Sequence, residues 1–248
     1  PWGMAQLVFL YDQNITKKHP RNMKELLAFA QENKGRVSYP LPPNFHGTTF
    51  LKQALIELTP DPAQLAKPVS ESDFERLTAP LWKYLDQLHP HMWRKGTSFP
   101  ANGSEMKRLL SDGELFIAIS FNPAEASNGI ATGELPESIR TYVHDTGTIG
   151  NSHFVAIPFN ASAKEGALVF ANFLLSPEAQ ARKSDPTIWG DPTVLAMGKL
   201  SQEEKDLFDA VPQGVATLSP EQLGSVLLEP HASWVEALEK NWLKRYSR

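Results

Sequence analysis

The segments LFIAISFNP, residues 115–123, and TGTIGNSHFVAIPF, residues 146–159, decide the fold of this chain. Each contains an apolar run that predicts a buried strand, 115–121 in the first and 153–159 in the second, and each run borders a loop of small residues. Strand ends that open onto helix N-termini are where open α/β sheets place ligands, because unpaired backbone N–H groups converge there. The two segments therefore predict a binding cleft before they indicate any reaction.

Composition is typical of a globular protein. The 248 residues are 41% hydrophobic and 21% charged, which is enough for one large domain or two small ones and argues against disorder. A formal net charge of −4 with scattered lysines and arginines argues against a nucleic-acid partner. The chain has no cysteine, which excludes disulfides, thiolate zinc sites and cysteine nucleophiles but fits either redox compartment.

Targeting and membrane signals are absent from the sequence as it stands. No apolar run approaches the ~20 residues that a membrane-spanning helix needs, and no charged-then-apolar signal segment precedes the predicted fold. The chain begins Pro1-Trp2-Gly3 and runs at once into a predicted strand at 5–11. We therefore expect that it is processed or that it begins within a domain.

Helices and strands are predicted to alternate, as in a mixed or parallel sheet. Asn22 with Glu25, Ser72 with Glu75 and Ser201 with Glu204 predict helix starts, and Pro80 is expected to restart the second of these helices near Thr78. Besides the three strands already named, RVSYP at 36–40 predicts another strand, and no strand is predicted after residue 185. The predicted helices are 23–34, 48–58, 73–89, 104–112 and 163–176, one that starts at Ser201, and 219–246, which is broken at Pro230.

The order of these pieces resembles a known family. The segments KGRVSYPLPPNFHGTTFLKQAL (34–55), SDGELFIAISFNPAEAS (111–127) and TGTIGNSHFVAIPFNASAKEGALVFANFLLSPEAQAR (146–182) are similar to the later portion of bacterial ABC-transporter extracellular solute-binding proteins. Within that superfamily they resemble the branch with thiamine-, iron- and polyamine-binding members, and most closely its YnjB-like members. AKEGALVFANFLLSPEAQAR is the most specific of these segments.

The resemblance implies an α/β fold of the periplasmic-binding-protein type II-like class, with two lobes joined by crossing strands and the ligand enclosed between them. Family members normally begin with a secretion signal and a first lobe of roughly a hundred residues, in keeping with domain sizes. This chain is therefore expected to carry an incomplete first lobe. The expected division is 1–14 as a crossing strand and first-lobe remnant, 15–150 as the second lobe, and 151–248 as the return strand with first-lobe and C-terminal helices.

Candidate ligand contacts lie in the loops that match the family's cleft. Each has a structural alternative: a helix cap for the first group, a plain strand-to-helix connection for the second, a turn for the third and core packing for the fourth. Hydroxyls, amides and backbone N–H groups would hold polar ligand groups, Glu125 a cation, and an indole a sugar or an amine. The candidates are Phe45, His46, Gly47, Thr48 and Thr49; Ser120, Asn122 and Glu125; Thr148 and Asn151; and Trp189 and Asp191.

Catalytic and metal-binding patterns are weak. Ser104 and Lys107 fit the serine–lysine spacing of penicillin-binding enzymes, but the Ser120 element follows after only 16 residues and no Lys-Thr-Gly comes later. Ser104 is instead expected to cap a helix. His89 and His91 lack a suitable third metal ligand, and the tyrosine pair of iron-binding relatives is missing, since Tyr142 stands between Thr141 and Val143. The sequence predicts no catalytic residue, no metal and no cofactor.

Three functional hypotheses follow. The leading one is the solute-binding component of an ABC importer, located in the periplasm, with a small molecule and a membrane permease as partners. The alternatives are an enzyme on the same scaffold and a protein-interaction module. For the ligand, a thiamine-like molecule, a polyamine and a sugar all remain open.

Overall fold

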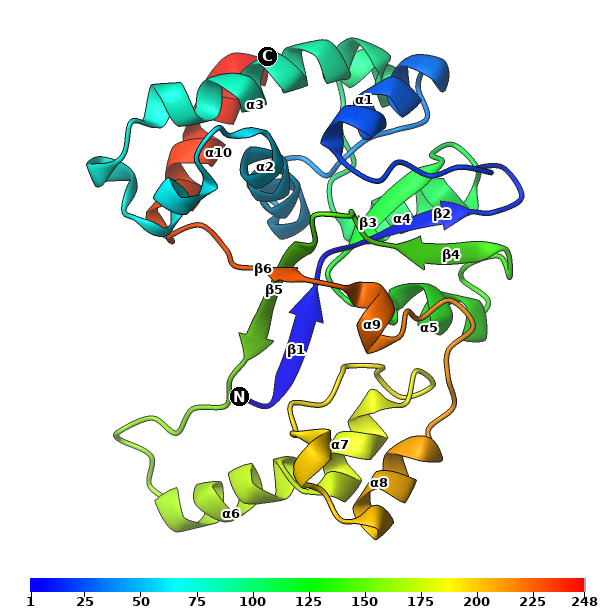
Figure 1. Cartoon of the computed structure of the whole chain (residues 1–248), viewed down its shortest axis with the longest axis vertical. Coiled ribbons are helices and arrows are strands. Elements are labelled where there is room, and N and C mark those ends of the chain that lie inside the picture. Colours follow the sequence, from blue (N-terminus) through cyan, green and yellow to red (C-terminus); the bar gives the residue numbers. More distant parts are fainter. Residues whose placement is uncertain (248) are drawn as a thin grey trace.

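Two small sheets organise the chain in a computed structural model that describes residues 1–247 (Figure 1). One sheet has the strand order β1–β5–β6 and the other β3–β2–β4. β2 pairs antiparallel with both its neighbours, β1 pairs antiparallel with β5, and β5 pairs parallel with β6. The strands are β1 Gly3–Gln6, β2 Val8–Asp12, β3 Ile117–Ser120, β4 Ile139–Tyr142, β5 Thr148–His153 and β6 Val226–Leu227.

The helices fall into two groups on either side of the β1–β5–β6 sheet (Figure 1). The upper part holds the β3–β2–β4 sheet with α1–α5 and α10, and the lower part holds α6–α8. In residues 1–247 no helix is both long and apolar enough to cross a membrane. The helices are α1 Met23–Glu32, α2 Phe45–Leu58, α3 Phe74–Leu88, α4 Gly103–Ser111, α5 Glu125–Ala131, α6 Lys164–Leu174, α7 Pro177–Ser184, α8 Gln202–Asp209, α9 Pro220–Leu223 and α10 Ser233–Tyr246.

The core of the upper part is built around α2 and α10. Trp234, Leu238 and Trp242 recur every fourth residue, so they share one face of α10, and all three are fully buried. The indole Nε1 of Trp242 donates to the Tyr39 hydroxyl at 2.8 Å. The last helix of the chain thus packs against α2 in the upper part, at the opposite end of the molecule from α6–α8 (Figure 1).

The predicted strand at 5–11 is divided at Leu7. Residues before Leu7 form β1 and pair with β5, whereas residues after it form β2 in the other sheet. The Leu7 N–H donates to the Ile149 carbonyl at 2.7 Å, which holds the chain at the point where it passes between the sheets. One apolar run therefore links the two sheets.

Two further strand predictions are wrong. Residues 36–40 are largely buried but have no strand partner, because their carbonyls bind loop N–H groups, Arg36 accepting from Phe116 and Val37 from Trp93 at 2.8 Å each. The predicted strand 153–159 lies mostly outside β5, which occupies 148–153 instead. Gly150 faces Gln6 there, and a Cβ on it would lie 2.9 Å from the Ala5 carbonyl oxygen, so its glycine serves strand pairing rather than a loop. β6 was not predicted.

Helix starts were predicted with mixed success. The Asn22 cap and the Ser201–Glu204 capping box are confirmed. α3 is capped by Asp73 rather than Ser72, and it continues through Pro80 without a break. α4 is capped by the Asn102 side chain rather than by Ser104.

The lower part carries an unusual surface. None of the residues of α6 is buried, although its sequence is apolar. Leu168, Val169, Phe170 and Phe173 are 57–72% exposed, and Phe159, which precedes the helix, is 90% exposed. An exposed apolar surface of this size is typical of an interface.

His89 should make folding stability depend on pH. Burial, offset in part by Asp86, lowers the pKa of His89 from 6.5 to about 4, so the folded chain holds the neutral imidazole against the Tyr39 hydroxyl at 2.6 Å. The unfolded chain takes up this proton near pH 6.5, hence stability is complete above that pH and falls as pH drops toward 4. We expect a loss of up to about 3 kcal/mol, measured by urea unfolding at about pH 7 and about pH 4.5. The variant His89→Gln should show a smaller loss over that range, and an unchanged loss would contradict the assignment.

Candidate functional site

A hollow of about 470 Å³ lies where the start of α2, the β3–α5 connection and the paired strands β1 and β5 meet. It collects residues from distant parts of the chain, including six of the twelve predicted contacts: Phe45, His46, Ser120, Asn122, Glu125 and Asn151. Its remaining lining residues are Ala5, Phe121 and His153. We call this site the hollow.

The first wall of the hollow is the first turn of α2. Asn44 caps this helix by accepting from the His46 N–H at 3.0 Å, so residues 45–49 are helical rather than a loop before a helix. Phe45 is half exposed, and its ring meets Phe121 edge-on at 5.1 Å. Gly103 makes room for the imidazole of His46, because a Cβ there would lie 2.9 Å from the ring. This wall thus presents a phenyl ring and an imidazole side by side.

His46 is a neutral hydrogen-bonding group at neutral pH. Burial lowers its pKa below 6.5, although the nearby Glu125 carboxylate acts in the opposite direction. A neutral imidazole has one donor and one acceptor nitrogen. His46 can therefore bind a polar group of either kind.

The β3–α5 connection forms the second wall. The Ser120 Oγ accepts from the Asn122 N–H at 3.0 Å, and the Asn122 Oδ1 accepts from the Ala124 N–H at 3.0 Å. These bonds fix the turn and occupy the oxygen of Asn122. Within residues 1–247 its Nδ2 has no protein acceptor, so the amide N–H groups are available to a ligand.

Glu125, the first residue of α5, is held from outside the hollow. Its Oε1 accepts from Lys107 Nζ at 2.8 Å, and the same Nζ donates to Glu134 at 2.7 Å. Burial alone would lower the pKa of Lys107, but the two carboxylates outweigh burial and raise it. Lys107 is therefore a fixed cation beside the hollow.

Strand β5 supplies the third wall. Asn151 Nδ2 donates to Glu229 Oε1 at 3.1 Å, and Glu229 in turn binds the buried Lys52 of α2. Two residues further along β5, His153 lies on the same side of the strand. Alternate residues of a strand share a face, so the sequence could have placed His153 beside Asn151. The predicted strand began at residue 153, however, and therefore left Asn151 out. Phe121 was not among the predicted contacts, although its neighbours Ser120 and Asn122 were.

The other predicted contacts on α2 and β5 do not line the hollow. Gly47 passes so close to Pro40 that a Cβ would overlap its carbonyl oxygen, Thr48 donates to Glu239 at 2.6 Å, and Thr49 is fully buried. Thr148 lies on β5, not in a loop, and accepts from Gln6 Nε2 at 3.0 Å. These residues pack α2 and β5 into position.

Trp189 and Asp191 lie in the segment after α7 and do not line the hollow. Trp189 is half exposed and packs against Trp2 at 5.3 Å. Asp191 is buried and forms an ion pair with Lys183 at 2.7 Å. A ligand contact by Trp189 stays a prediction, whereas the carboxylate of Asp191 already has a cationic partner.

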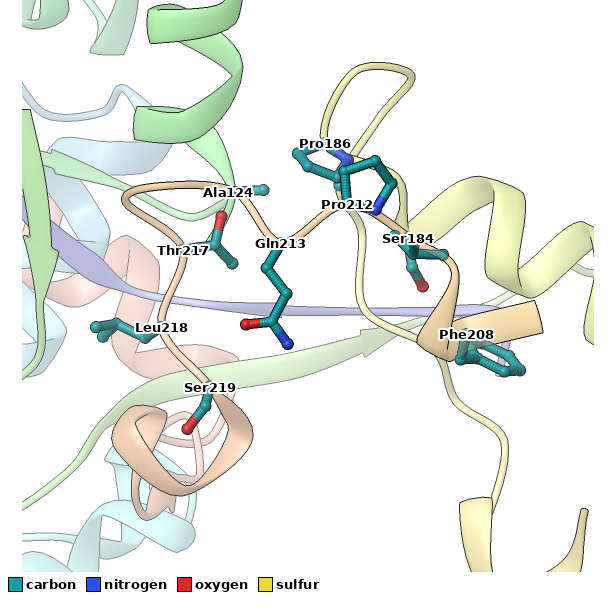
Figure 2. A pocket seen from close by; sticks show the side chains of 12 residues that line it. Ala124, Ser184, Pro186, Phe208, Pro212, Gln213, Thr217, Leu218 and Ser219 are labelled. Atoms are coloured by element: carbon teal, nitrogen blue, oxygen red, sulfur yellow. The ribbon is translucent and has the colours of Figure 1, made fainter. Parts of the chain in front are cut away.

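A second cavity of about 190 Å³ lies between the start of α5 and the segments 184–190 and 208–219 (Figure 2). Figure 2 shows Gln213 and Thr217 on the strap that crosses it. None of its twelve lining residues is charged. The hollow is larger and carries more varied polar groups, so it is the better candidate for a ligand site.

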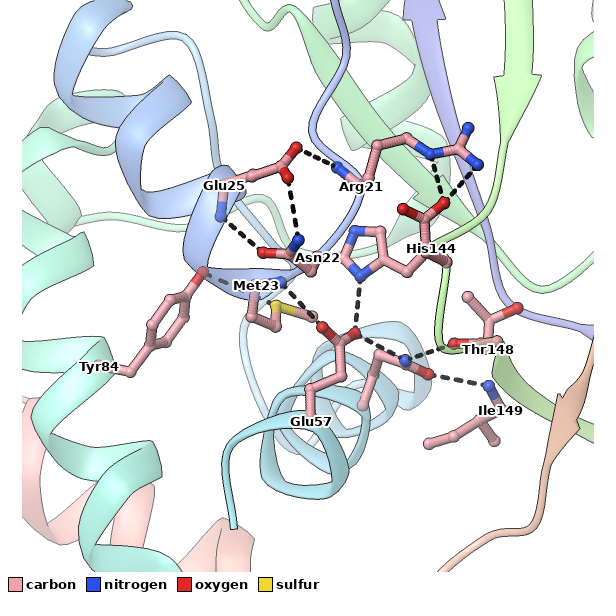
Figure 3. A network of polar contacts seen from close by, with 12 residues as sticks. Arg21, Asn22, Met23, Glu25, Glu57, Tyr84, His144, Thr148 and Ile149 are labelled. Atoms are coloured by element: carbon pink, nitrogen blue, oxygen red, sulfur yellow. Dashed lines mark hydrogen bonds and ion pairs between the residues drawn. The ribbon is translucent and has the colours of Figure 1, made fainter. Parts of the chain in front are cut away.

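A buried polar network anchors the far end of α2 (Figure 3). Glu57 accepts from the Met23 N–H at 2.8 Å and from Gln53 Nε2 at 2.8 Å, and it lies 2.6 Å from His144 Nδ1. Gln53 also donates to the Gly147 carbonyl and accepts from the Ile149 N–H at 2.8 Å. The helix that presents Phe45 and His46 is therefore tied at its other end to β5.

The family model for bacterial extracellular solute-binding proteins matches residues 1–203. The chain belongs to this family. A relative from Escherichia coli (strain K12), "Protein YnjB", is 49% identical over 246 residues, which are 99% of this chain and 62% of that protein. The chain thus spans less than two thirds of the length of this relative.

Two solved structures share the fold. A "Periplasmic thiamin binding protein" superposes with a TM-score of 0.63 at 19% identity, over 100% of this chain and 64% of that one. A "Putative spermidine/putrescine ABC transporter" from Listeria monocytogenes superposes with a TM-score of 0.60 at 16% identity, over 99% of this chain and 67% of that one. The expected periplasmic-binding-protein type II-like fold is confirmed.

Proposed function

We propose that this chain is the solute-binding component of a bacterial ABC importer, which captures a small molecule in the hollow for delivery to a membrane permease. The observation that carries this proposal is the meeting of three distant segments, all with available polar groups, beside the paired strands β1 and β5. Family membership supports a role in binding rather than catalysis, and a location outside the cytoplasmic membrane, in the periplasm.

We further propose that β1, β5 and β6 are the strands that cross between two lobes. The upper part, built mainly from residues 15–150 and completed by α10, is then the second lobe, and α6–α8 belong to the first. Closure about the crossing strands would bring the first lobe over the hollow, as in hinged binding proteins.

The exposed apolar side chains of α6 indicate that this helix contacts another protein surface. A helix with Val169, Phe170 and Phe173 all exposed is more hydrophobic than a solvated surface helix. We propose that protein surface outside these 248 residues covers it in the intact first lobe.

The main test is native followed by denaturing mass spectrometry of the protein as its host makes it. A small molecule that is retained in the native spectrum and released on unfolding supports the proposal and identifies the ligand. The absence of any adduct, together with no calorimetric binding of thiamine, spermidine or simple sugars, would contradict it.

Removing the imidazole of His46 should weaken capture of the identified ligand. We expect His46→Ala to lower affinity by about tenfold, because one hydrogen bond and part of the wall are lost in a partly buried site. Isothermal titration calorimetry measures the change. His231→Ala removes an exposed imidazole elsewhere in the chain and is the matched control. Equal affinities of the two variants for the ligand would show that the His46 side chain does not contribute to binding.

A further inference from the structure

Lys107 does not line the hollow, but it forms an ion pair with a carboxylate that does. Its Nζ lies between two carboxylates, 2.8 Å from Glu125 and 2.7 Å from Glu134. Glu125 lines the hollow, whereas Glu134 is 58% exposed and does not. Lys107 thus joins the carboxylate of the ligand site to one at the surface.

The charge balance of the lining is simple. Glu125 is the one carboxylate among the nine lining residues, and these residues include no lysine or arginine. Glu229, which accepts a hydrogen bond from the lining residue Asn151, is paired with Lys52. His46 is neutral at neutral pH for the reason given above. Each acidic group at or behind the lining therefore has a bound lysine.

This balance disfavours highly charged groups. A phosphate in the hollow would meet no free cation, since Lys107 and Lys52 are both held by carboxylates. A free ammonium would have to compete with Lys107 for Glu125 and would give up its hydration for an already compensated carboxylate. An uncharged donor meets no such penalty, because Glu125 still has acceptor capacity.

We propose that Lys107 is a specificity-determining residue that makes the hollow select an uncharged, flat, hydrogen-bonding portion of the ligand, which packs on Phe45 and Phe121. The proposal rests on the solute-binding function and narrows its ligand class. The neutral ligand group donates a hydrogen bond to Glu125, accepts one from the Asn122 amide and forms one with the His46 imidazole. Among the three ligand classes considered, a thiamine-like molecule with an aminopyrimidine ring fits, and a polyamine does not.

The test compares Lys107→Met with Arg108→Met in the protein as its host makes it. Arg108 directly follows Lys107 on α4, pairs with Asp112 and is 59% exposed, so its loss removes the same charge outside the hollow. Calorimetry with thiamine, spermidine and fructose 6-phosphate gives the three affinities at low and at physiological ionic strength. We expect the wild type to bind thiamine at least about tenfold more tightly than the other two probes.

In Lys107→Met the ratio of spermidine to thiamine affinity should rise by about tenfold, because Glu125 loses its partner. Arg108→Met should leave this ratio within about twofold of wild type. Lys107→Arg should restore the wild-type ratio, and Glu134→Gln should not raise it. Preference of the wild type for spermidine or fructose 6-phosphate, or an equal shift in the two methionine variants, would overturn the proposal.

A second readout separates this proposal from the solute-binding function. If no probe binds the wild type, that function loses support for these ligands, and NMR titration of the His46 ring decides the role of Lys107. Lys107→Met should raise the pKa of His46, since an unpaired Glu125 favours the imidazolium. Arg108→Met should leave it unchanged. A His46 pKa that is the same in both variants would overturn the role of Lys107.

Discussion

Asp191→Ala is expected to lower the free energy of unfolding by about 3–5 kcal/mol, the cost of breaking a buried ion pair by removing one partner. The side chains of Lys183 and Asp191 are 2% and 6% exposed, and their contact is 2.7 Å long. Lys183 Nζ also donates to the carbonyls of Asp191 and Pro192 at 2.9 and 2.6 Å. Burial lowers the pKa of Lys183 even with Asp191 beside it, so the carboxylate is needed to hold the charge there.

Urea unfolding followed by tryptophan fluorescence measures the loss. Asp206→Ala is the matched control, since Asp206 is exposed on α8 and its loss should cost less than about 0.5 kcal/mol. Lys183→Met in the Asp191→Ala background should recover part of the stability, because it removes the unpaired charge. A stable Asp191→Ala variant that has lost ligand binding would show instead that Asp191 serves the ligand.

Glu57→Ala is expected to cost a similar 3–5 kcal/mol or so, because it removes the shared acceptor of a buried network. The side chains of Glu57 and His144 are 4% and 0% exposed. Without the carboxylate, the Met23 N–H and His144 Nδ1 lose their partners in a site that water does not reach.

Thermal and urea unfolding of Glu57→Ala and Glu57→Gln test this network. The glutamine keeps an acceptor oxygen and should lose only part of what alanine loses. Glu32→Ala, at an exposed position of α1, is the control and should stay within about 0.5 kcal/mol of wild type. Equal stability of Glu57→Ala and the control would mean that the network contributes nothing.

Several helix starts could be predicted from the sequence because they follow from local signals, whereas the fold class was predicted from the family resemblance. The Asn22 cap and the Ser201–Glu204 box depend on residues three apart, and both were confirmed. The strand at 36–40 failed because its apolar residues report burial, while a strand also needs a partner that lies far away in the chain. β5 was placed too late because Gly147 and Gly150 are both typical of a turn. Gly147 does lie in a turn, with φ 93°, whereas Gly150 belongs to the strand and pairs with Gln6 of β1.

The candidate site divides along the same line. Several of the predicted residues that line the hollow lie at or just beyond the end of a helix or strand. His46 is in the first turn of α2, and Asn122 follows β3. Thr48 and Thr49 share the same sequence segment as His46, but a helical turn rotates them by about 100° per residue into the core. Lys107 had been considered only as part of a serine–lysine pattern, and its contact with Glu125, 18 residues away, depends on how the chain folds between them.

The anchoring of α2 fixes this helix along its whole length. Its 14 residues span about 21 Å, from Phe45 at one end to the turn of Glu57 at the other. Thr48 binds Glu239 near the start, Lys52 binds Glu229 in the middle, and Gln53 and Glu57 bind Gly147, Ile149 and His144 near the end. Phe45 and His46 therefore stand on a preorganised wall, so a ligand that binds there need not spend binding free energy on ordering it.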